Sequence, residues 1–384
     1  MREIVIIGGG ITGLTAALDL AQRGLRVVVL DRGQMSETDI SGRDLDSRIY
    51  AIRPGLVAYL SHLEVWERID SLRLQPVYGM WVKGSNEQSA LEFDSHKCGV
   101  ESLATTVEEE ILLRALVNAC ADNDNIEYRS DCVFESVKCQ VADVLVRTNQ
   151  GEFRSKLVIA ADGARSTVRE GIGIDLEVKD YQSLGIVANF EAASWHGGRA
   201  YQVFSDEGIL ALLPLPGNRV SIVWSLPESI AQNILSGSDE DLSDLIFRRF
   251  DALGPLRCIT PARSFPLRRG MACEYTAGRV VLMGDALRHI HPLAGQGLNL
   301  GLADARKLGE LIGAAKTDDP GSQQILRRYA RARREETIVF SEFTDLLSSL
   351  FSRNKLWSDI GNIGFRFVNQ CPPLKRYFVN RAVE

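Results

Sequence analysis

The first 31 residues place the tightest constraint on what this chain can fold into. Residues 3–7 read as a buried strand, residues 13–23 as a helix, and residues 26–30 as a second apolar strand that ends at Asp31. A strand, a helix and a strand in so short a stretch predict a βαβ unit with parallel strands. A chain that begins in this way is predicted to be an α/β protein.

The turn between the first strand and the helix carries the pattern Gly8-x-Gly10-x-x-Gly13. Gly8 permits a tight turn, Gly10 lets the backbone approach a pyrophosphate, and Gly13 lets the helix pack close to its strand. The helix N-terminus offers N–H groups to the phosphate, and the Asp31 carboxylate accepts hydrogen bonds from ribose hydroxyls. The pattern predicts a nucleotide site without a 2′-phosphate, because Asp31 would repel one. A glycine-rich turn with no ligand is the alternative.

Size and composition narrow the class of protein. At 384 residues the chain is longer than one ordinary core, so two domains are expected. A net charge of −6 with no basic stripe argues against nucleic acid as a partner. The seven cysteines form no C-x-x-C pair, so neither a disulfide framework nor a metal site is expected. The N-terminus enters a strand at once, and no run approaches the ~18 apolar residues of a membrane span, which predicts a cytoplasmic protein.

Two further aspartates follow apolar strands. Residues 156–160 run into Asp162-Gly163, and residues 279–283 run into Gly284-Asp285. Carboxylates at the carboxyl ends of strands lie where open α/β sheets bind ligands. An NAD site needs only the first glycine motif, whereas the ribityl chain of FAD needs hydroxyl acceptors beyond the adenosine half. The three motifs together therefore indicate FAD, although either aspartate alone is better interpreted as a turn or helix-capping residue.

The middle of the chain has a different pattern of apolar and turn-forming residues. Strand-like stretches broken by turn residues run from about residue 181 to 226, which predicts an antiparallel sheet. Helical spacing covers residues 106–121 and, after Gly295-Gln296-Gly297, about 298–315. We expect a discontinuous FAD-binding domain of residues 1–75, 100–180 and 270–340, a substrate-binding β domain of residues 76–99 and 181–269, and a helical C-terminal segment of residues 341–384.

Longer motifs carry a resemblance to a known family. They are Gly284-Asp285-Ala286, the run His291-Pro292-Leu293-Ala294-Gly295-Gln296-Gly297-Leu298-Asn299-Leu300-Gly301, and residues 210–216 with 221–224. Over roughly residues 1–380, the chain resembles the single-component flavoprotein monooxygenases of the para-hydroxybenzoate hydroxylase fold, and within them the ubiquinone-biosynthesis hydroxylases. The resemblance implies an α/β fold in which a mostly antiparallel β substrate domain interrupts a Rossmann-like FAD-binding domain, with a helical C-terminus.

The resemblance also implies an activity. FAD is expected as the bound cofactor, NAD(P)H and O₂ as co-substrates, and a C4a-hydroperoxyflavin as the species that hydroxylates a polyprenylated phenol. Two alternatives stay open: hydroxylation of a small soluble aromatic compound, and a non-catalytic flavin-binding scaffold subunit of a biosynthetic complex. A polyprenyl substrate would favour a peripheral position at the inner membrane surface.

The expected site residues come from the motifs, except for Arg48 beside the cofactor and Val133 beside the adenine, which the resemblance alone supplies. His291 titrates near neutral pH and is the candidate catalytic residue; its alternative is a loop histidine bonded to the backbone. The expected cofactor-binding residues are Gly8, Gly10, Gly13, Asp31, Arg48, Val133, Asp162, Gly163, Gly284, Asp285, Pro292, Gly295, Gly297, Leu298 and Asn299.

Two positions depart from the family pattern. Leu287-Arg288 replace the usual Ala-His after Gly-Asp-Ala, and Glu109 stands where relatives have Asn or Arg near the cofactor. A carboxylate would repel a pyrophosphate, so Glu109 is expected either to turn away or to pair with a cation.

The C-terminal stretch is amphipathic and then basic. Apolar residues recur from Ile338 to Phe351, and Lys375, Arg376 and Arg381 follow. Two interpretations remain open: docking on the body of the protein or homo-oligomer formation, and contact with a membrane surface or with ubiquinone-biosynthesis proteins.

Overall fold

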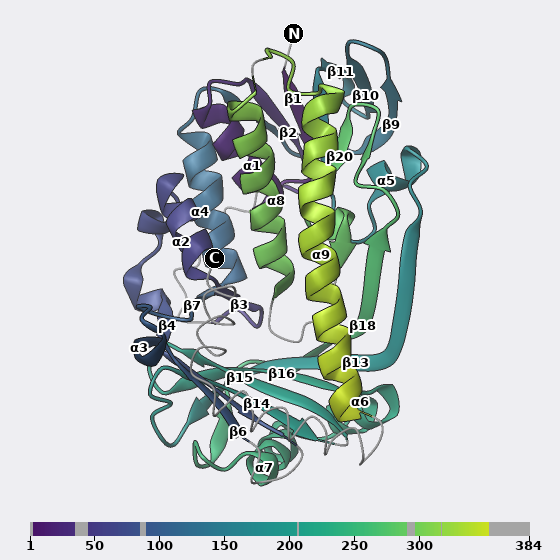
Figure 1. Ribbon diagram of the computed structural model, residues 1–384. Helices are drawn as coiled ribbons and strands as arrows, with labels where there is room; N and C mark the ends of the chain where they lie inside the picture. The colour runs from purple at the N-terminus through teal and green to yellow at the C-terminus, as the bar shows by residue number, and fades with distance from the viewer. Residues whose placement is uncertain are drawn as a thin grey trace.

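A computed structural model describes residues 3–34, 45–84, 90–205, 207–289, 296–315 and 317–352, with side chains described up to residue 338. Figure 1 shows long helices standing beside an upper sheet, and a second, wide sheet across the lower end of the molecule. Within the described ranges, no helix has both the length and the apolar character that crossing a membrane requires.

The N-terminal βαβ unit has the predicted parallel arrangement. β1 (Ile4–Ile7) pairs with β2 (Val27–Leu30), and α1 (Ile11–Gln22) connects them. The α/β prediction is therefore confirmed. The complete sheet has the order β19-β20-β12-β1-β2-β8, where β12 (Leu157–Ala160), β20 (Val280–Leu282) and β8 (Ile126–Arg129) are parallel to their neighbours and β19 (Thr276–Ala277) is antiparallel.

Both faces of this sheet are covered, and for this reason its central strands are apolar at every position. Ile4 and Ile6 pack with α1, α4 (Glu109–Ala121) and α8 (Gln296–Gly313) on one face. Val5 and Ile7 pack on the other face against a three-stranded antiparallel sheet of order β11-β10-β9. Its strands are β11 (Gly151–Ser155), β10 (Val144–Thr148) and β9 (Phe134–Cys139).

The wide lower sheet is mostly antiparallel, as the turn-rich middle of the chain predicts (Figure 1). One face is packed by α6 (Glu228–Leu235) and α7 (Asp239–Arg249), which cover a core that includes Trp224 and Phe190. The order is β21-β18-β13-β16-β15-β14-β5-β6, with β17 (Leu256–Cys258) also on β13; the strands are β21 (Arg288–His289), β18 (Arg263–Ala272), β13 (Leu176–Ala192), β16 (Arg219–Pro227), β15 (Gly208–Leu215), β14 (Arg199–Ser205), β5 (Gly79–Lys83) and β6 (Ala90–Asp94).

A small antiparallel sheet lies between the two large ones. β7 (Ala104–Glu108) is its central strand, flanked by β3 (Ile49–Ile52) and β4 (Gln75–Val77). The predicted helix over 106–121 is wrong in its first residues, which end β7; the β-branched run Thr105-Thr106-Val107 favours a strand. The remaining short elements are α2 (Pro54–His62), η1 (Trp66–Arg68), η2 (Ser71–Arg73), α3 (Ser95–Cys98), α5 (Thr167–Gly171) and η3 (Gly284–Ala286).

The expected domain bounds stay a proposal. β13 crosses the bound at residue 180, so one strand belongs to the edges of both proposed domains. α9 (Gln323–Ser352) runs along the molecule from the upper sheet to the lower one (Figure 1). Residues 353–384, which include the basic stretch, lie outside the described residues.

A buried ion network fixes α8 and α9 to the turn after β20. Asp304 on α8 is fully buried, and its carboxylate accepts hydrogen bonds from Arg288 Nη1 and Nη2, each at 2.9 Å, and from Arg333 Nε at 2.6 Å. It also accepts from the backbone N–H of Gly284 at 3.0 Å. Burial alone would raise the pKa of Asp304, but the two arginines outweigh it and hold the pKa below its ordinary value.

Arg288 is one of the two residues at which the sequence departs from the family pattern, and the network explains it. Its side chain is 1% exposed and forms a two-point contact with Asp304. Leu287 is fully buried in the cluster beneath the three-stranded sheet. The departure therefore lies in the packed interior.

We expect Asp304→Asn to lower the free energy of unfolding by about 3–5 kcal/mol, because the buried guanidinium of Arg288 loses its counter-charge and that of Arg333 keeps only the partly exposed Glu336. The same change at Asp122, whose ion pair with Arg68 is on the surface, should cost less than about 1 kcal/mol. Urea unfolding of both variants makes the measurement. Equal and small losses of unfolding free energy in Asp304→Asn and Asp122→Asn would contradict the role given to the network.

The network also predicts a pH dependence. Because the pKa of Asp304 is lowered in the fold, its contribution is complete above the unfolded-state pKa of about 3.9 and is lost as the pH falls through the lower folded-state value. In that acid range the wild-type unfolding free energy should decline more steeply than that of Asp304→Asn, by up to about 1.4 kcal/mol per pH unit. Parallel slopes would contradict this prediction.

Candidate cofactor site

The glycine motif lies in the turn from β1 to α1, and the three glycines meet different surroundings. Gly8 has φ +112°, and a Cβ there would lie 2.3 Å from the carbonyl oxygen of Ala161. A Cβ on Gly13 would lie 2.0 Å from the carbonyl oxygen of Gly8. These two glycines are therefore required by the fold itself.

Gly10 differs from Gly8 and Gly13 because a Cβ there would meet no atom within 4 Å. Gly10 is the N-cap of α1 and has no side chain with which to bind the first-turn N–H groups. A helix N-terminus with free N–H groups and open space in front of it is suited to an anion. The geometry fits a pyrophosphate at Gly10.

Asp31 follows β2 directly, next to the glycine turn. Its Oδ2 accepts from the backbone N–H of Gly9 at 2.5 Å, and its Oδ1 accepts from the N–H of Gly33 at 2.7 Å. These bonds hold the carboxylate at the carboxyl end of the strand. Each oxygen retains lone pairs that can accept from a ribose hydroxyl.

Tyr128, at the end of β8, is a neighbour that the sequence analysis does not single out. Its hydroxyl would lie 2.5 Å from a Cβ on Gly9, so Gly9 must be glycine for Tyr128 to stand there. Burial, with a smaller contribution from Asp31, raises the pKa of Tyr128 to about 12. A neutral phenol therefore lies beside the nucleotide turn at physiological pH.

Val133 lies shortly after β8, where the backbone N–H of Cys132 donates to the carbonyl of Asp31 at 2.8 Å. The N–H of Val133 donates to the side chain of Asn149 at 2.8 Å, and its own side chain is half exposed. The structure thus places Val133 near Asp31. Its contact with adenine stays a prediction.

Asp162 binds the first turn of α5. Its Oδ1 accepts from Ser166 Oγ at 2.5 Å, and its Oδ2 accepts from the N–H of Val168 at 3.2 Å. This is the helix-capping alternative raised for this aspartate. The neighbouring Gly163 has φ +87°, and a Cβ there would meet no atom within 4 Å, so the space beside it is open.

Asp285 follows β20 in the short helix η3, whose first residue is Gly284 at φ +56°. Burial raises the pKa of Asp285, while His289 and Arg48 oppose the shift. The residue is nonetheless exposed to solvent. Within the part of the chain that the structure describes, no donor lies within hydrogen-bonding distance of it, so it is free to accept from ribityl hydroxyls.

Arg48 and Glu109 form an ion pair, which resolves the expectation for Glu109 in favour of pairing with a cation. Arg48 Nη1 donates to Oε1 and Oε2 of Glu109 at 3.1 and 3.0 Å. The Tyr50 hydroxyl donates to Glu109 Oε1 at 3.1 Å. Burial would lower the pKa of Arg48, but Tyr50, Glu109 and Asp285 raise it. Asp285 is the last of the groups that raise the pKa of Arg48, so the two side chains are within electrostatic range of each other.

Asn299, in the first turn of α8, joins that helix to β3. Its Nδ2 donates to the carbonyl of Ala51 at 2.8 Å, and its Oδ1 accepts from the N–H of Arg53 at 3.0 Å. Gly297 has open space around its Cα, and Leu298 is half buried against the core. His291, Pro292 and Gly295 lie outside the described residues.

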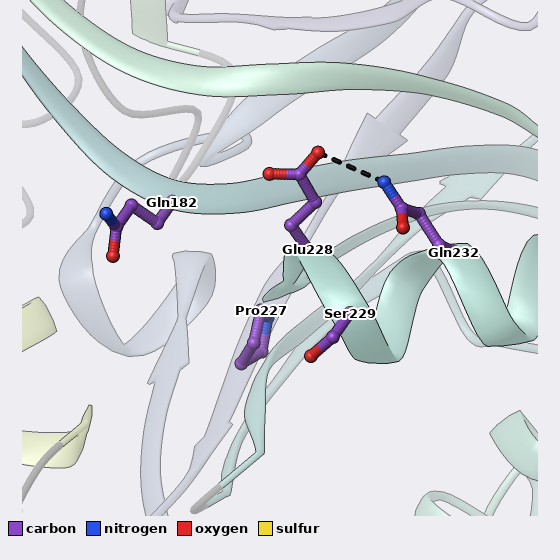
Figure 2. Close-up of a pocket in the computed structure, with 5 residues that line it drawn as sticks. All are labelled: Gln182, Pro227, Glu228, Ser229 and Gln232. Atoms are coloured by element: carbon purple, nitrogen blue, oxygen red, sulfur yellow. Dashed lines mark hydrogen bonds between the residues drawn. The ribbon is translucent and has the colours of Figure 1, made fainter.

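A separate hollow of about 470 Å³ lies at the start of α6, and no expected site residue lines it. Figure 2 shows the residues around it. In it Gln232 donates to Glu228 at 3.0 Å, so part of its polar lining is already paired. The hollow is wide open to solvent. Its lining residues are Gln182, Pro227, Glu228, Ser229 and Gln232. The expected cofactor-binding aspartates lie elsewhere, at the carboxyl ends of the parallel strands, where open α/β sheets bind ligands.

Comparison with known proteins decides the family. The model of the FAD binding domain family matches residues 1–339. The chain belongs to this family. The resemblance drawn from the motifs is confirmed, and the protein is an FAD-dependent monooxygenase.

Two relatives of this monooxygenase align over nearly its full length. Ubiquinone hydroxylase UbiL of Rhodospirillum rubrum is 31% identical over 388 residues, covering 100% of this chain and 90% of the relative. The 3-demethoxyubiquinol 3-hydroxylase of Escherichia coli is 30% identical, covering 99% and 98%. Among solved structures, p-nitrophenol 4-monooxygenase PnpA of Pseudomonas putida has a TM-score of 0.78 at 21% identity, covering 99% of this chain and 97% of that one. That likeness confirms the fold of the flavoprotein monooxygenase.

The contrast between Gly10 and Gly13 gives a test of the site. Gly10 has φ −77°, which any residue can adopt, so Gly10→Val should lose only about 1 kcal/mol of stability, the cost of a poorer N-cap residue. The added side chain fills the space in front of α1, and we expect FAD affinity to fall more than about tenfold. Fluorescence titration of the apoprotein with FAD makes the measurement.

Gly13→Ala is the matched control for this test. Its Cβ would collide with the carbonyl oxygen of Gly8, so this variant should lose stability as well as FAD binding. Unchanged FAD affinity in Gly10→Val would show that the pyrophosphate binds elsewhere.

Proposed function

We propose that this protein is an NAD(P)H-consuming, FAD-dependent hydroxylase that acts on a polyprenylated phenol in ubiquinone biosynthesis. The observation that carries the pathway is the full-length similarity to two hydroxylases whose names place them in ubiquinone metabolism. The lower sheet adds a physical argument about the substrate.

One face of the lower sheet is directed at the nucleotide-binding part of the molecule. Asn189 on β13 is fully buried, and its Nδ2 donates to the carbonyl of Asp46 at 2.8 Å, which fixes the direction of that face. Val187 lies two residues earlier on the same face and is paired with Val223, which is paired with Ala211. These three side chains form an apolar row.

The apolar row is only half buried, although the opposite face of the same strands is fully packed by α6 and α7. Val187, Val223 and Ala211 belong to none of the buried clusters formed by the described residues. Leu213, one pair further along, is likewise half buried. An apolar surface turned toward the cofactor domain suits a substrate with a hydrocarbon tail.

The residues of this chain have separate tasks in the proposed reaction. Gly10 and the N-terminus of α1 hold the pyrophosphate, while Asp31 and Asp285 accept from the hydroxyls of the ribose and the ribityl chain. The flavin, when bound, supplies the oxygen chemistry, through the C4a-hydroperoxyflavin that the family resemblance implies. NAD(P)H as reductant, O₂ as oxidant, and a peripheral position at the inner membrane surface are parts of the same proposal.

The two alternatives differ from this proposal in ways that can be measured. A small soluble aromatic substrate would stimulate NAD(P)H oxidation without any dependence on a prenyl tail. The feature that favours a non-catalytic scaffold is the departure from the family pattern at Leu287-Arg288, and the structure accounts for that departure by packing and by the Asp304 network. The apolar row favours the prenylated substrate over the soluble one.

Deletion of the gene should lower the cell's quinone content and leave a precursor that lacks one hydroxyl group. Lipid extraction and mass spectrometry make the measurement, and the mass deficit identifies the missing oxygen. Unchanged quinone content would contradict the pathway assignment.

Complementation with Asp285→Ala separates catalysis from scaffolding. The variant loses the exposed carboxylate that we expect to bind the ribityl chain, so it should fold but fail to restore quinone synthesis. Folding is checked by its melting temperature. Normal quinone levels in that strain would favour the scaffold.

A further inference from the structure

Two carboxylates act on the guanidinium group of Arg48. The Glu109 carboxylate accepts two hydrogen bonds from a single nitrogen of Arg48 and a third from the Tyr50 hydroxyl. Asp285 also interacts electrostatically with Arg48. The cation thus faces two carboxylates, one in direct contact.

Arg48 keeps part of its binding capacity despite this ion pair. Its side chain is 64% exposed, whereas that of Glu109 is 29% exposed. Nε and Nη2 of Arg48 have no partner among the residues that the structure describes, so two nitrogens are available to an anion. Glu109 therefore holds the guanidinium in place while cancelling its charge.

The position of Glu109 makes this pairing a fixed part of the fold. Glu109 is the first residue of α4, and its backbone N–H donates to the carbonyl of Arg48 at 3.0 Å. β3 and β7 are paired immediately before it, with Ile49 opposite Glu108. The two charged side chains therefore start from adjacent backbone positions.

We propose that Glu109 sets the affinity and the redox behaviour of the cofactor by neutralising Arg48. This rests on the proposed function, in which FAD is bound, and on the place of Arg48, which directly precedes the strand that Asn299 joins to the first turn of α8. FAD carries a negatively charged pyrophosphate, and the reduced flavin carries a further negative charge. A carboxylate at position 109 repels both charges. The site therefore binds FAD more weakly than it would with a neutral residue at this position, and the loss is larger for the reduced flavin than for the oxidised flavin.

Charge arithmetic predicts the outcome of a double-mutant cycle. Glu109→Gln leaves a net cation and should tighten FAD binding about tenfold, while Arg48→Gln leaves a net anion and should weaken it about tenfold. The double variant is neutral again and should return to the wild-type affinity. If Arg48 acted only through hydrogen bonds and Glu109 only as its anchor, the double variant would bind as weakly as Arg48→Gln, which would overturn the proposal.

Glu110→Gln is the matched control. Glu110 is the next residue of α4, is exposed, and loses the same charge. Its affinity for FAD should stay within about threefold of wild type, because water screens an exposed charge. A gain equal to that of Glu109→Gln would show a general charge effect and would overturn the role given to Glu109.

The experiment measures FAD affinity of the apoprotein by fluorescence quenching, at low salt and at 1 M NaCl, with the melting temperature as a check of folding. The gain in Glu109→Gln should shrink at high salt, where charges are screened over about 3 Å. Reduced flavin should gain about tenfold more than oxidised flavin, which raises the two-electron midpoint potential by about 30 mV. Unchanged or weaker binding in Glu109→Gln would overturn the inference, whereas a wild-type protein that takes up no FAD would contradict the proposed function itself.

Discussion

The carboxylate of Asp304 is the interaction on which the arrangement of the site depends. It joins three segments: the turn after β20 through the N–H of Gly284, the strand β21 through Arg288, and α9 through Arg333. All three charged side chains are nearly inaccessible to water. A buried charge network of this kind is tolerated only when each partner is present, so the turn that carries Asp285 is fixed as firmly as the interior.

Three aspartates lie at or just after the ends of parallel strands, and they have three different surroundings. Asp31 is held by two backbone N–H groups, Asp162 is taken up by the first turn of α5, and Asp285 lacks a donor within reach among the described residues. The sequence separates Asp31, which follows the glycine motif, from the other two, but it gives Asp162 and Asp285 the same pair of interpretations. Only the spatial surroundings distinguish a carboxylate that shapes a turn from one that is available to a ligand.

The sequence predicts those features that depend on neighbours along the chain. The βαβ unit, the glycine turn and the position of Asp31 follow from spacing within 31 residues. The antiparallel sheet follows from the change in residue pattern along the chain, whereas the discontinuous FAD-binding domain stays a prediction. The strand β7 shows the limit of this reasoning, since its last residues fit a helical pattern equally well and only pairing with β3 and β4 decides between the two.

Contacts between distant segments could not be predicted in this way. Arg48 and Glu109 are 61 residues apart, and no pattern in the sequence around either residue indicates that the two form an ion pair. Tyr128 is recognised as a neighbour of the glycine turn only in the structure, where its hydroxyl occupies the space beside Gly9. Arg288 is conspicuous in the sequence as a departure, but its partners on α8 and α9 are set by how those helices pack against the turn.

The order of strands in the upper sheet has a consequence for synthesis. β12 ends at residue 160, and its neighbour β20 begins at residue 280. A ribosome adds about 5–20 residues per second, so the fully apolar edge of β12 waits several seconds for its partner while the lower sheet is made. An exposed edge of this kind can pair with other chains. The nascent protein is therefore most vulnerable to aggregation while its middle third emerges, and a chaperone that covers that edge would raise the yield of folded enzyme.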